Sequence, residues 1–190
     1  MAKRIVLGGL LGGVMAFLMG SFFHMATHLG ETGIRNLPSE DNVVGAMRTS
    51  IHEPGLYFFP GMDMSKRPTD AEQAAYLEKY QQGPTGILIF SPGGEGLQFG
   101  KRLFNQFLFV LLAALIVALI LGITASSTTF ATRVLIVVLI AVFAGTWSDL
   151  PYWNWYNFPT NYTCARILEG MLTWGVAGLG MAAVVKRPAA

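Results

Sequence analysis

Four apolar segments set the tightest limit on how this chain can fold, because each approaches the length of helix that crosses a bilayer, about 20 residues. Three of them are the residue ranges 5–29, 103–123 and 168–185. The fourth, residues 134–147, is shorter. It reaches spanning length if it begins near Thr128 and Arg133 extends its guanidinium to the lipid headgroups. We therefore predict a membrane α-helical protein with four transmembrane helices.

The composition agrees with a membrane location and argues against several other classes of protein. Of the 190 residues, 53% are hydrophobic and 13% are charged, whereas a soluble domain averages about 25% charged residues. The mean hydropathy is +0.48. A net charge of +2 gives no electrostatic basis for binding nucleic acid. The single cysteine, Cys164, excludes an internal disulfide and a cysteine-ligated metal cluster.

The first apolar segment follows a basic start, MAKR, which is also the start of many signal peptides. No small-x-small cleavage motif follows the apolar run at a suitable distance. We therefore expect residues 1–29 to be retained as transmembrane helix 1.

The distribution of charge predicts the orientation of the chain in the membrane. With four helices both ends lie on one side, and that side carries basic residues without acidic ones. These are Lys3, Arg4, Arg133, Lys186 and Arg187. All eleven acidic residues lie on the other side or at its membrane boundary. Because cytoplasmic segments collect Lys and Arg, we predict a multi-pass protein of a bacterial inner membrane with both termini in the cytoplasm.

Residues 30–102 then form a small extracytoplasmic α+β domain inserted between helices 1 and 2. Two helices are expected, one capped by Ser39 and one beginning with the capping box of Thr69 and Glu72. Each is followed by a short apolar run, GLYFFPG at 55–61 and GILIFSPG at 86–93. These runs predict two buried, paired strands. A helix–strand unit would then occur twice, either as an internal duplication or because two short apolar strands look alike by chance. A two-stranded sheet is not stable alone, so its partner surface would be the bundle, lipid or another subunit.

Residues 103–190 supply helices 2–4, and small residues predict which helices pack closely. In the first helix small residues recur at every fourth position: Gly8, Gly12, Ala16 and Gly20. The last helix carries a related stripe: Gly170, Trp174, Gly178 and Ala182. Since small residues at this spacing let helices approach in lipid, we predict a tight contact between the first and last helices. The middle helices, rich in Leu, Ile and Val, are expected to face lipid or to be loosely packed neighbours.

Continued by fours, the first stripe reaches His24 and His28, and Glu31 follows on the same side of a helix. Two imidazoles and a carboxylate suit copper, zinc or iron, and His52 offers a further ligand. Asp149 and Glu169 are expected at the same depth. The alternative is a helix end that becomes polar, with Arg166 pairing one of these carboxylates. Nearby sulfur ligands for Cu(I) are Met62 and Met64.

The segment 147–165 is expected to be an aromatic extracytoplasmic loop, because Pro151 and Pro159 oppose a single regular helix. Its candidate cofactor-binding residues are Trp147, Trp153, Trp155 and Tyr156. Trp and Tyr favour the membrane–water interface. The loop is therefore an interfacial belt, a wall for a quinone, pigment or lipid, or a contact surface for a partner.

Three functions follow from these patterns. No catalytic motif is found, which favours a non-enzymatic accessory or structural membrane subunit. Such a subunit would dock on a membrane-protein partner, or assemble with itself, through the outer domain and aromatic loop. The alternatives are an extracytoplasmic copper- or zinc-binding or redox protein, and a binder of a quinone, pigment or lipid.

Overall fold

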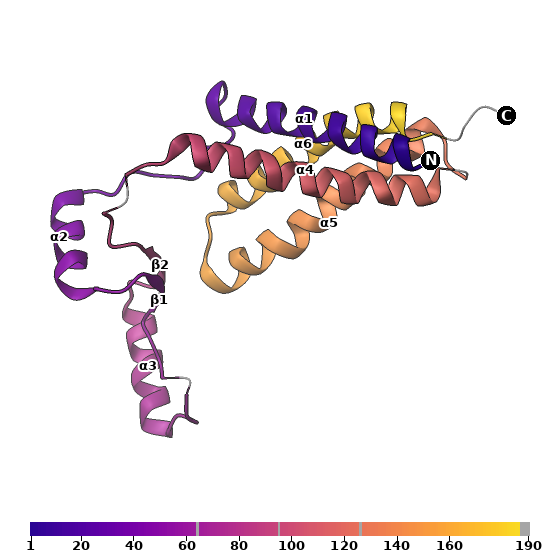
Figure 1. The fold of residues 1–190 in the computed structure, drawn as a ribbon. Helices are drawn as coiled ribbons and strands as arrows, with labels where there is room; N and C mark the ends of the chain where they lie inside the picture. Colours follow the sequence, from indigo (N-terminus) through magenta and orange to yellow (C-terminus); the bar gives the residue numbers. More distant parts are fainter. Residues whose placement is uncertain (64, 95, 126, 187–190) are drawn as a thin grey trace. The chain divides into compact units, whose positions relative to one another are not determined.

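The computed structural model of the chain describes residues 1–63, 65–94, 96–125 and 127–186 (Figure 1). The chain forms two compact units, one made of residues 1–34 and 97–190 and the other of residues 35–96. The first unit is a helical bundle, and the second combines two helices with a two-stranded sheet. Met64 and Arg187, which the sequence analysis named, lie outside the described residues.

Four long helices form the bundle, and each is long and apolar enough to cross a membrane. They are α1 (Ala2–Met25), α4 (Phe99–Thr124), α5 (Phe130–Tyr156) and α6 (Thr160–Val184). Helix α1 packs against both α4 and α6, and α5 packs mainly against α6 (Figure 1). The prediction of four spanning helices is confirmed.

The buried core of the bundle consists mostly of small side chains where helices meet. Alanines contribute at several of these positions: Ala16, Ala114, Ala118 and Ala177. The largest fully buried side chains are Leu121, Met181, Val137 and Val185. Most of the larger apolar side chains lie instead on the outer surface of the helices, which is the arrangement expected of a bundle whose solvent is lipid.

The predicted close approach of the first and last helices is confirmed. A Cβ on Gly8 would meet the side chain of Val185, and a Cβ on Gly12 would meet that of Met181. The stripe ends before Gly20, where an added Cβ would have no neighbour within 4 Å. Its predicted continuation reaches His24, which lies in the last turn of α1 and meets Glu169 of α6, but fails at His28 because α1 ends at Met25.

The expectation that the middle helices face lipid or pack loosely is wrong for the side of α4 that meets α1. A Cβ added to Gly9 would lie 3.0 Å from the Cα of Leu115, and one added to Gly13 would lie 3.1 Å from the Cα of Leu111. Two glycine faces therefore exist on α1, one against α6 and one against α4. The sequence analysis followed only the i, i+4 series and missed the neighbouring one.

Arg133 does not extend to the headgroups as predicted. Its side chain is buried, with 6% of the residue exposed. Nη1 donates to the Thr128 carbonyl at 2.7 Å, while Nε and Nη2 donate to the Ala182 carbonyl at 3.3 and 3.2 Å. The carbonyls at the end of a helix lack intrahelical donors, and the guanidinium supplies them. Arg133 thus joins the start of α5 to the end of α6.

The aromatic segment is helical over most of its length, contrary to the expected loop from residue 147. Helix α5 continues through Pro151 to Tyr156. The chain turns only at residues 157–159, where Asn157 has a left-handed φ of 56° and Pro159 precedes α6. Proline removes one helical hydrogen bond, which was not enough here to end the helix.

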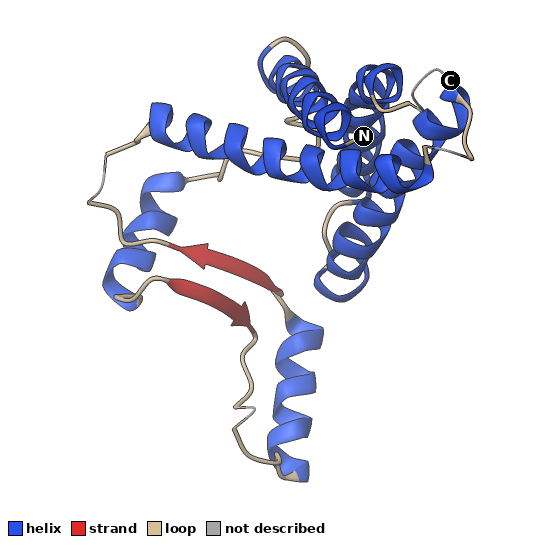
Figure 2. Cartoon of the chain, turned by 45° about the vertical axis from the view of Figure 1, so that its right-hand side comes forward, coloured by secondary structure: helices blue, strands red, loops and turns tan. Residues whose placement is uncertain are grey.

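The second unit contains α2 (Glu40–Ser50), β1 (Gly55–Phe59), α3 (Asp70–Gln82) and β2 (Gly86–Phe90) in that order (Figure 2). The strands pair antiparallel, with Leu56 opposite Ile89. The predicted helix–strand order and the pairing of the strands are therefore confirmed.

The predicted N-terminal caps of the two helices differ in outcome: the cap of α3 is confirmed in full and that of α2 only in position. Thr69 and Glu72 form the predicted capping box at the start of α3. Ser39 stands at the N-cap of α2, but its side chain makes no capping hydrogen bond. The prediction that the strands are buried is wrong, because none of the described residues between 35 and 96 is buried.

Candidate functional site

A cluster of three ionisable side chains joins α1 and α6 inside the bundle. His24 Nε2 lies 3.2 Å from Glu169 Oε1, and Arg166 Nη1 donates to Glu169 Oε2 at 3.1 Å. Glu169 is 7% exposed, whereas His24 and Arg166 keep about half of their side chains accessible. A buried carboxylate is stable only when it is paired, and here each oxygen has its own partner.

Local structure explains why these three side chains meet. Arg166 and Glu169 lie three residues apart on α6, so they share one face of that helix. His24 lies in the last turn of α1. The chain then bends back, and Gly30 N–H donates to the Phe23 carbonyl at 3.4 Å. A side chain at position 30 would overlap the imidazole of His24, so the glycine permits this placement of the ring.

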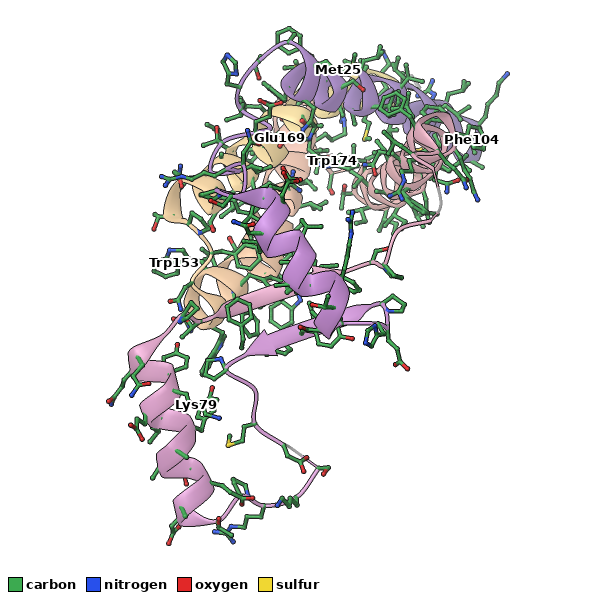
Figure 3. All side chains as sticks on the ribbon, turned by 90° about the vertical axis from the view of Figure 1, so that its left-hand side faces the viewer. Met25, Lys79, Phe104, Trp153, Glu169 and Trp174 are labelled. Carbon is green, nitrogen blue, oxygen red and sulfur yellow. The ribbon has the colours of Figure 1, made fainter. Side chains whose placement is uncertain are left out.

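The cluster borders a cavity of about 550 Å³ lined by residues of α1, α4 and α6. All of the lining residues belong to the bundle. Figure 3 shows Glu169 and Trp174 on α6, both of which line the cavity. Its polar wall is formed by the cluster together with Ser21, Gln106 and Thr173, and its apolar wall includes Phe17 and Phe99.

Of the residues predicted to hold a metal, only His24 belongs to this cluster. The side chain of His28 is fully exposed, and its Nδ1 lies 4.0 Å from Glu31 Oε2. His52 lies in the other unit. Within the described residues, no group of three or more His, Cys, Asp or Glu side chains is placed to hold a metal ion. Metal binding stays a prediction.

The two carboxylates expected at the depth of the histidines are separated. Glu169 joins His24, as the expected convergence requires, whereas Asp149 accepts a hydrogen bond from Ser148 at 3.2 Å. The proposed alternative pairing is also present, because Arg166 bonds Glu169. The histidine and the arginine therefore share one carboxylate.

The aromatic residues proposed to bind a cofactor lie apart from this cavity. Trp147 and Trp155 are 76% and 72% exposed. Trp153 donates its indole N–H to Thr160 Oγ1 at 3.0 Å, and it lies well away from Glu169 and Trp174 in Figure 3. None of them lines the cavity. A cofactor at these residues stays a prediction.

Sequence reasoning did not single out several of the residues that line the cavity, among them Phe17, Phe99, Leu103, Gln106 and Thr173. One signal was available. Asn105 and Gln106 place two amides near the start of a helix that is strongly apolar beyond them, and a polar side chain inside a membrane segment usually faces protein or a cavity.

A second candidate site is the sheet of the 35–96 unit. Leu56, Phe58, Ile87 and Ile89 alternate with their neighbours along the two strands, so they share one face of the sheet. Ile89 is 83% exposed and Leu56 is 56% exposed. These four residues form an apolar sheet face, and exposed apolar patches are candidates for binding sites.

These features define the class of the chain as a multi-pass membrane protein with an inserted α+β unit. Comparison with known proteins found no protein family, no curated protein and no solved structure that matches the chain.

Proposed function

We propose that this chain is a non-catalytic accessory or structural subunit of a membrane assembly. It docks on a membrane-protein partner, or on copies of itself, through the 35–96 unit. The observation that carries this proposal is that the unit has regular secondary structure without any buried residue among those described. Burial of apolar surface is the main force that holds a domain together, so a unit without a core needs an external surface.

The apolar sheet face and the free edges of the sheet fit such a surface. A two-stranded sheet is marginally stable in water, and this one consists of β1 and β2 only. Each strand pairs on one side, which leaves its other edge open among the described residues. An open edge accepts a strand from another chain, and the side chains on the sheet face then supply specificity.

We further propose that the unit lies outside the cytoplasm of a bacterial cell and that both termini lie inside. The basis is the distribution of charge. The termini carry Lys3, Arg4 and Lys186 without acidic neighbours, whereas most acidic residues lie in the 35–96 unit. The positive-inside rule then orients all four helices.

Photo-crosslinking in membranes tests the docking proposal. A photoreactive amino acid replaces Ile89 on the sheet face or, as a matched control, Glu78 on the exposed surface of α3. We expect an adduct with a second copy or one defined membrane protein from position 89, at several times the yield from position 78. The variant Leu56→Glu should reduce the yield at position 89, because a charge then stands opposite it in the sheet.

The proposal is wrong if position 89 gives no adduct in membranes and the protein purified in mild detergent is a monomer without a companion. A crosslink of equal yield from positions 78 and 89 would also contradict it, because the contact would then not involve the sheet face.

A further inference from the structure

The cavity of the bundle goes beyond the proposed docking function, because it lies in the other unit and has the build of a ligand site. Its volume of about 550 Å³ falls inside the range of small-molecule pockets, about 300–1,000 Å³. Helices α4 and α6 both pack on α1 but make little or no contact with each other. Residues of all three helices line the cavity.

The polarity of the lining changes along the helices. His24, Arg166 and Glu169 lie at the level where α1 ends and α4 begins. The charged side chains of the lining are confined to this level. About two turns further into the bundle, the lining mixes the uncharged polar side chains of Gln106 and Thr173 with apolar ones such as Val110 and Trp174. A ligand that fills the space therefore needs both hydrogen-bonding atoms and apolar surface.

The charges of the cluster favour an uncharged head. The carboxylate of Glu169 and the guanidinium of Arg166 form an ion pair at 3.1 Å, so their formal charges cancel. An anionic head would find no free countercharge in this ion pair and so would gain no net electrostatic attraction from it. A neutral head needs only hydrogen-bond partners.

The free groups of the cavity are mainly donors. Within the described part of the chain, the Arg166 guanidinium bonds the protein through Nη1 alone, and no protein atom bonds the Gln106 amide or the Thr173 hydroxyl. A guanidinium has five N–H groups, while an amide and a hydroxyl each donate and accept. The matching head presents carbonyl oxygens, which accept hydrogen bonds.

Aromatic side chains from three helices surround the same space: Phe17, Phe99 and Trp174. Aromatic rings pack well against other flat rings, either offset or edge to face. A planar head with carbonyl oxygens and an apolar tail satisfies the donors, the rings and the apolar part of the lining together.

We propose that this cavity binds a lipoquinone, that is, a quinone ring with an apolar tail, with the ring carbonyls near Arg166, Gln106 and Thr173. Binding needs no electron transfer and no further group. The His24–Glu169–Arg166 cluster holds the polar end of the site in place.

Trp174 provides a direct readout, because a quinone quenches the fluorescence of an indole that it touches. The full chain carries the changes Trp147→Phe, Trp153→Phe and Trp155→Phe, so that Trp174 is its only tryptophan. It is titrated in mild detergent with a benzoquinone that carries a decyl chain. Decanoate, with an equally long chain and an anionic head, competes in a second titration. We expect saturable quenching by the quinone and weak competition by decanoate.

Filling the cavity should abolish the effect. A Cβ on Gly20 or Gly170, both in the cavity wall, would meet no atom within 4 Å. Gly20→Leu and Gly170→Leu therefore fill space without disturbing the packing, and each should weaken binding at least about tenfold. Gly100→Leu is the matched control, since this glycine is also unobstructed but lies outside the cavity, and it should leave binding unchanged.

Quenching that does not saturate, or that is equal in Gly170→Leu and Gly100→Leu, would overturn the proposal, because it would show partitioning into detergent. Decanoate that displaces the quinone at equal concentration would also overturn it, since the site would then be selected by an anionic head. The unmodified protein gives an independent measurement, in which extraction after purification should release a stoichiometric quinone from it but not from Gly170→Leu.

Discussion

At the scale of single residues, Glu169 makes the polar contact between α1 and α6, because its carboxylate lies against both His24 and Arg166. Removing it alone leaves His24 and Arg166 without their acceptor, whereas removing it with Arg166 leaves no unpaired charge. We expect Glu169→Leu to lower the free energy of unfolding by about 1–3 kcal/mol. The double variant with Arg166→Leu should recover part of that loss. Thermal unfolding in mild detergent measures both.

Glu31→Leu is the control for this prediction, because the Glu31 side chain is 69% exposed and lies 4.0 Å from its histidine. A contact of that kind contributes little to stability. Equal effects of Glu31→Leu and Glu169→Leu would show that the buried ion pair is not the source of the loss.

The stability of helix α3 should depend on pH through the carboxyl group of its capping residue Glu72. The Lys66 ammonium, and then the backbone N–H and hydroxyl of Thr69, hold the pKa of Glu72 below its ordinary value. A lowered pKa in the folded state means that the cap contributes stability above the pKa of the unfolded chain. This contribution is lost as the pH falls through the folded pKa. We expect the carbon-13 signal of the Glu72 carboxyl to titrate below the range of ordinary glutamates.

Two variants separate the causes of this shift. Lys66→Met and Thr69→Ala should each raise the pKa of Glu72, because each removes a hydrogen bond to its carboxylate. Arg67→Met removes a neighbouring cation that makes no hydrogen bond to Glu72 among the described contacts, and it should move the pKa less. A midpoint that does not respond to Lys66→Met would contradict the assignment.

The residues of the site were only partly predictable from sequence. Spacing and apolar periodicity placed His24 and Glu169 at one depth, but they did not say which histidine faces the bundle. That depends on where α1 ends. The helix stops at Met25, so His28 leaves the helical face and becomes exposed. The i, i+4 spacing runs on past this point, so it does not mark the residue at which α1 stops.

At the scale of elements, the two glycine faces of α1 fix how closely its neighbours approach. Gly9 is the sharper test, because a Cβ there meets the backbone of Leu115 at 3.0 Å, and backbone cannot rotate away. We expect Gly9→Val to separate α1 from α4 and to lower the free energy of unfolding by roughly 1–3 kcal/mol. Thermal unfolding in detergent measures the effect.

Gly20→Val on the same helix is the matched control, since an added Cβ there has no neighbour within 4 Å. It should leave the midpoint unchanged or raise it slightly, because valine loses less backbone entropy than glycine on folding. A decrease at Gly20 equal to that at Gly9 would point to a general intolerance of branched residues in α1.

The bounds of elements were predictable where a local signal acts alone. The capping box set the start of α3, and Pro159 stands immediately before α6. The prediction that Pro151 interrupts the helix was wrong. Helix α5 has 27 residues, and its remaining turns hold it together despite one missing hydrogen bond. The prediction that the two strands are buried was wrong for a different reason. Apolar runs predict the strand, but burial depends on a second layer, and the 35–96 unit has no buried residue among those described.

At the scale of the whole molecule, the two units differ in what holds them together. The bundle buries Leu121, Met181 and Val137 between helices, while the 35–96 unit keeps its described side chains at least partly exposed. Regions with few buried contacts open at lower free energy than the core. Local opening should therefore expose the 35–96 unit to proteases long before the bundle unfolds.

Limited trypsin digestion of the full chain in mild detergent tests this difference. Lys66 is exposed in the loop between β1 and α3, whereas Arg133 is 6% exposed and hydrogen-bonded through its guanidinium to α6. We expect cleavage after Lys66 at least about 100-fold faster than cleavage after Arg133, because the second cut requires opening of the core. Lys66→Gln should remove the first cut without hastening the second. Cleavage at the two sites at similar rates would mean that the bundle opens as readily as the 35–96 unit, and the division into a stable bundle and a weakly held docking unit would then fail.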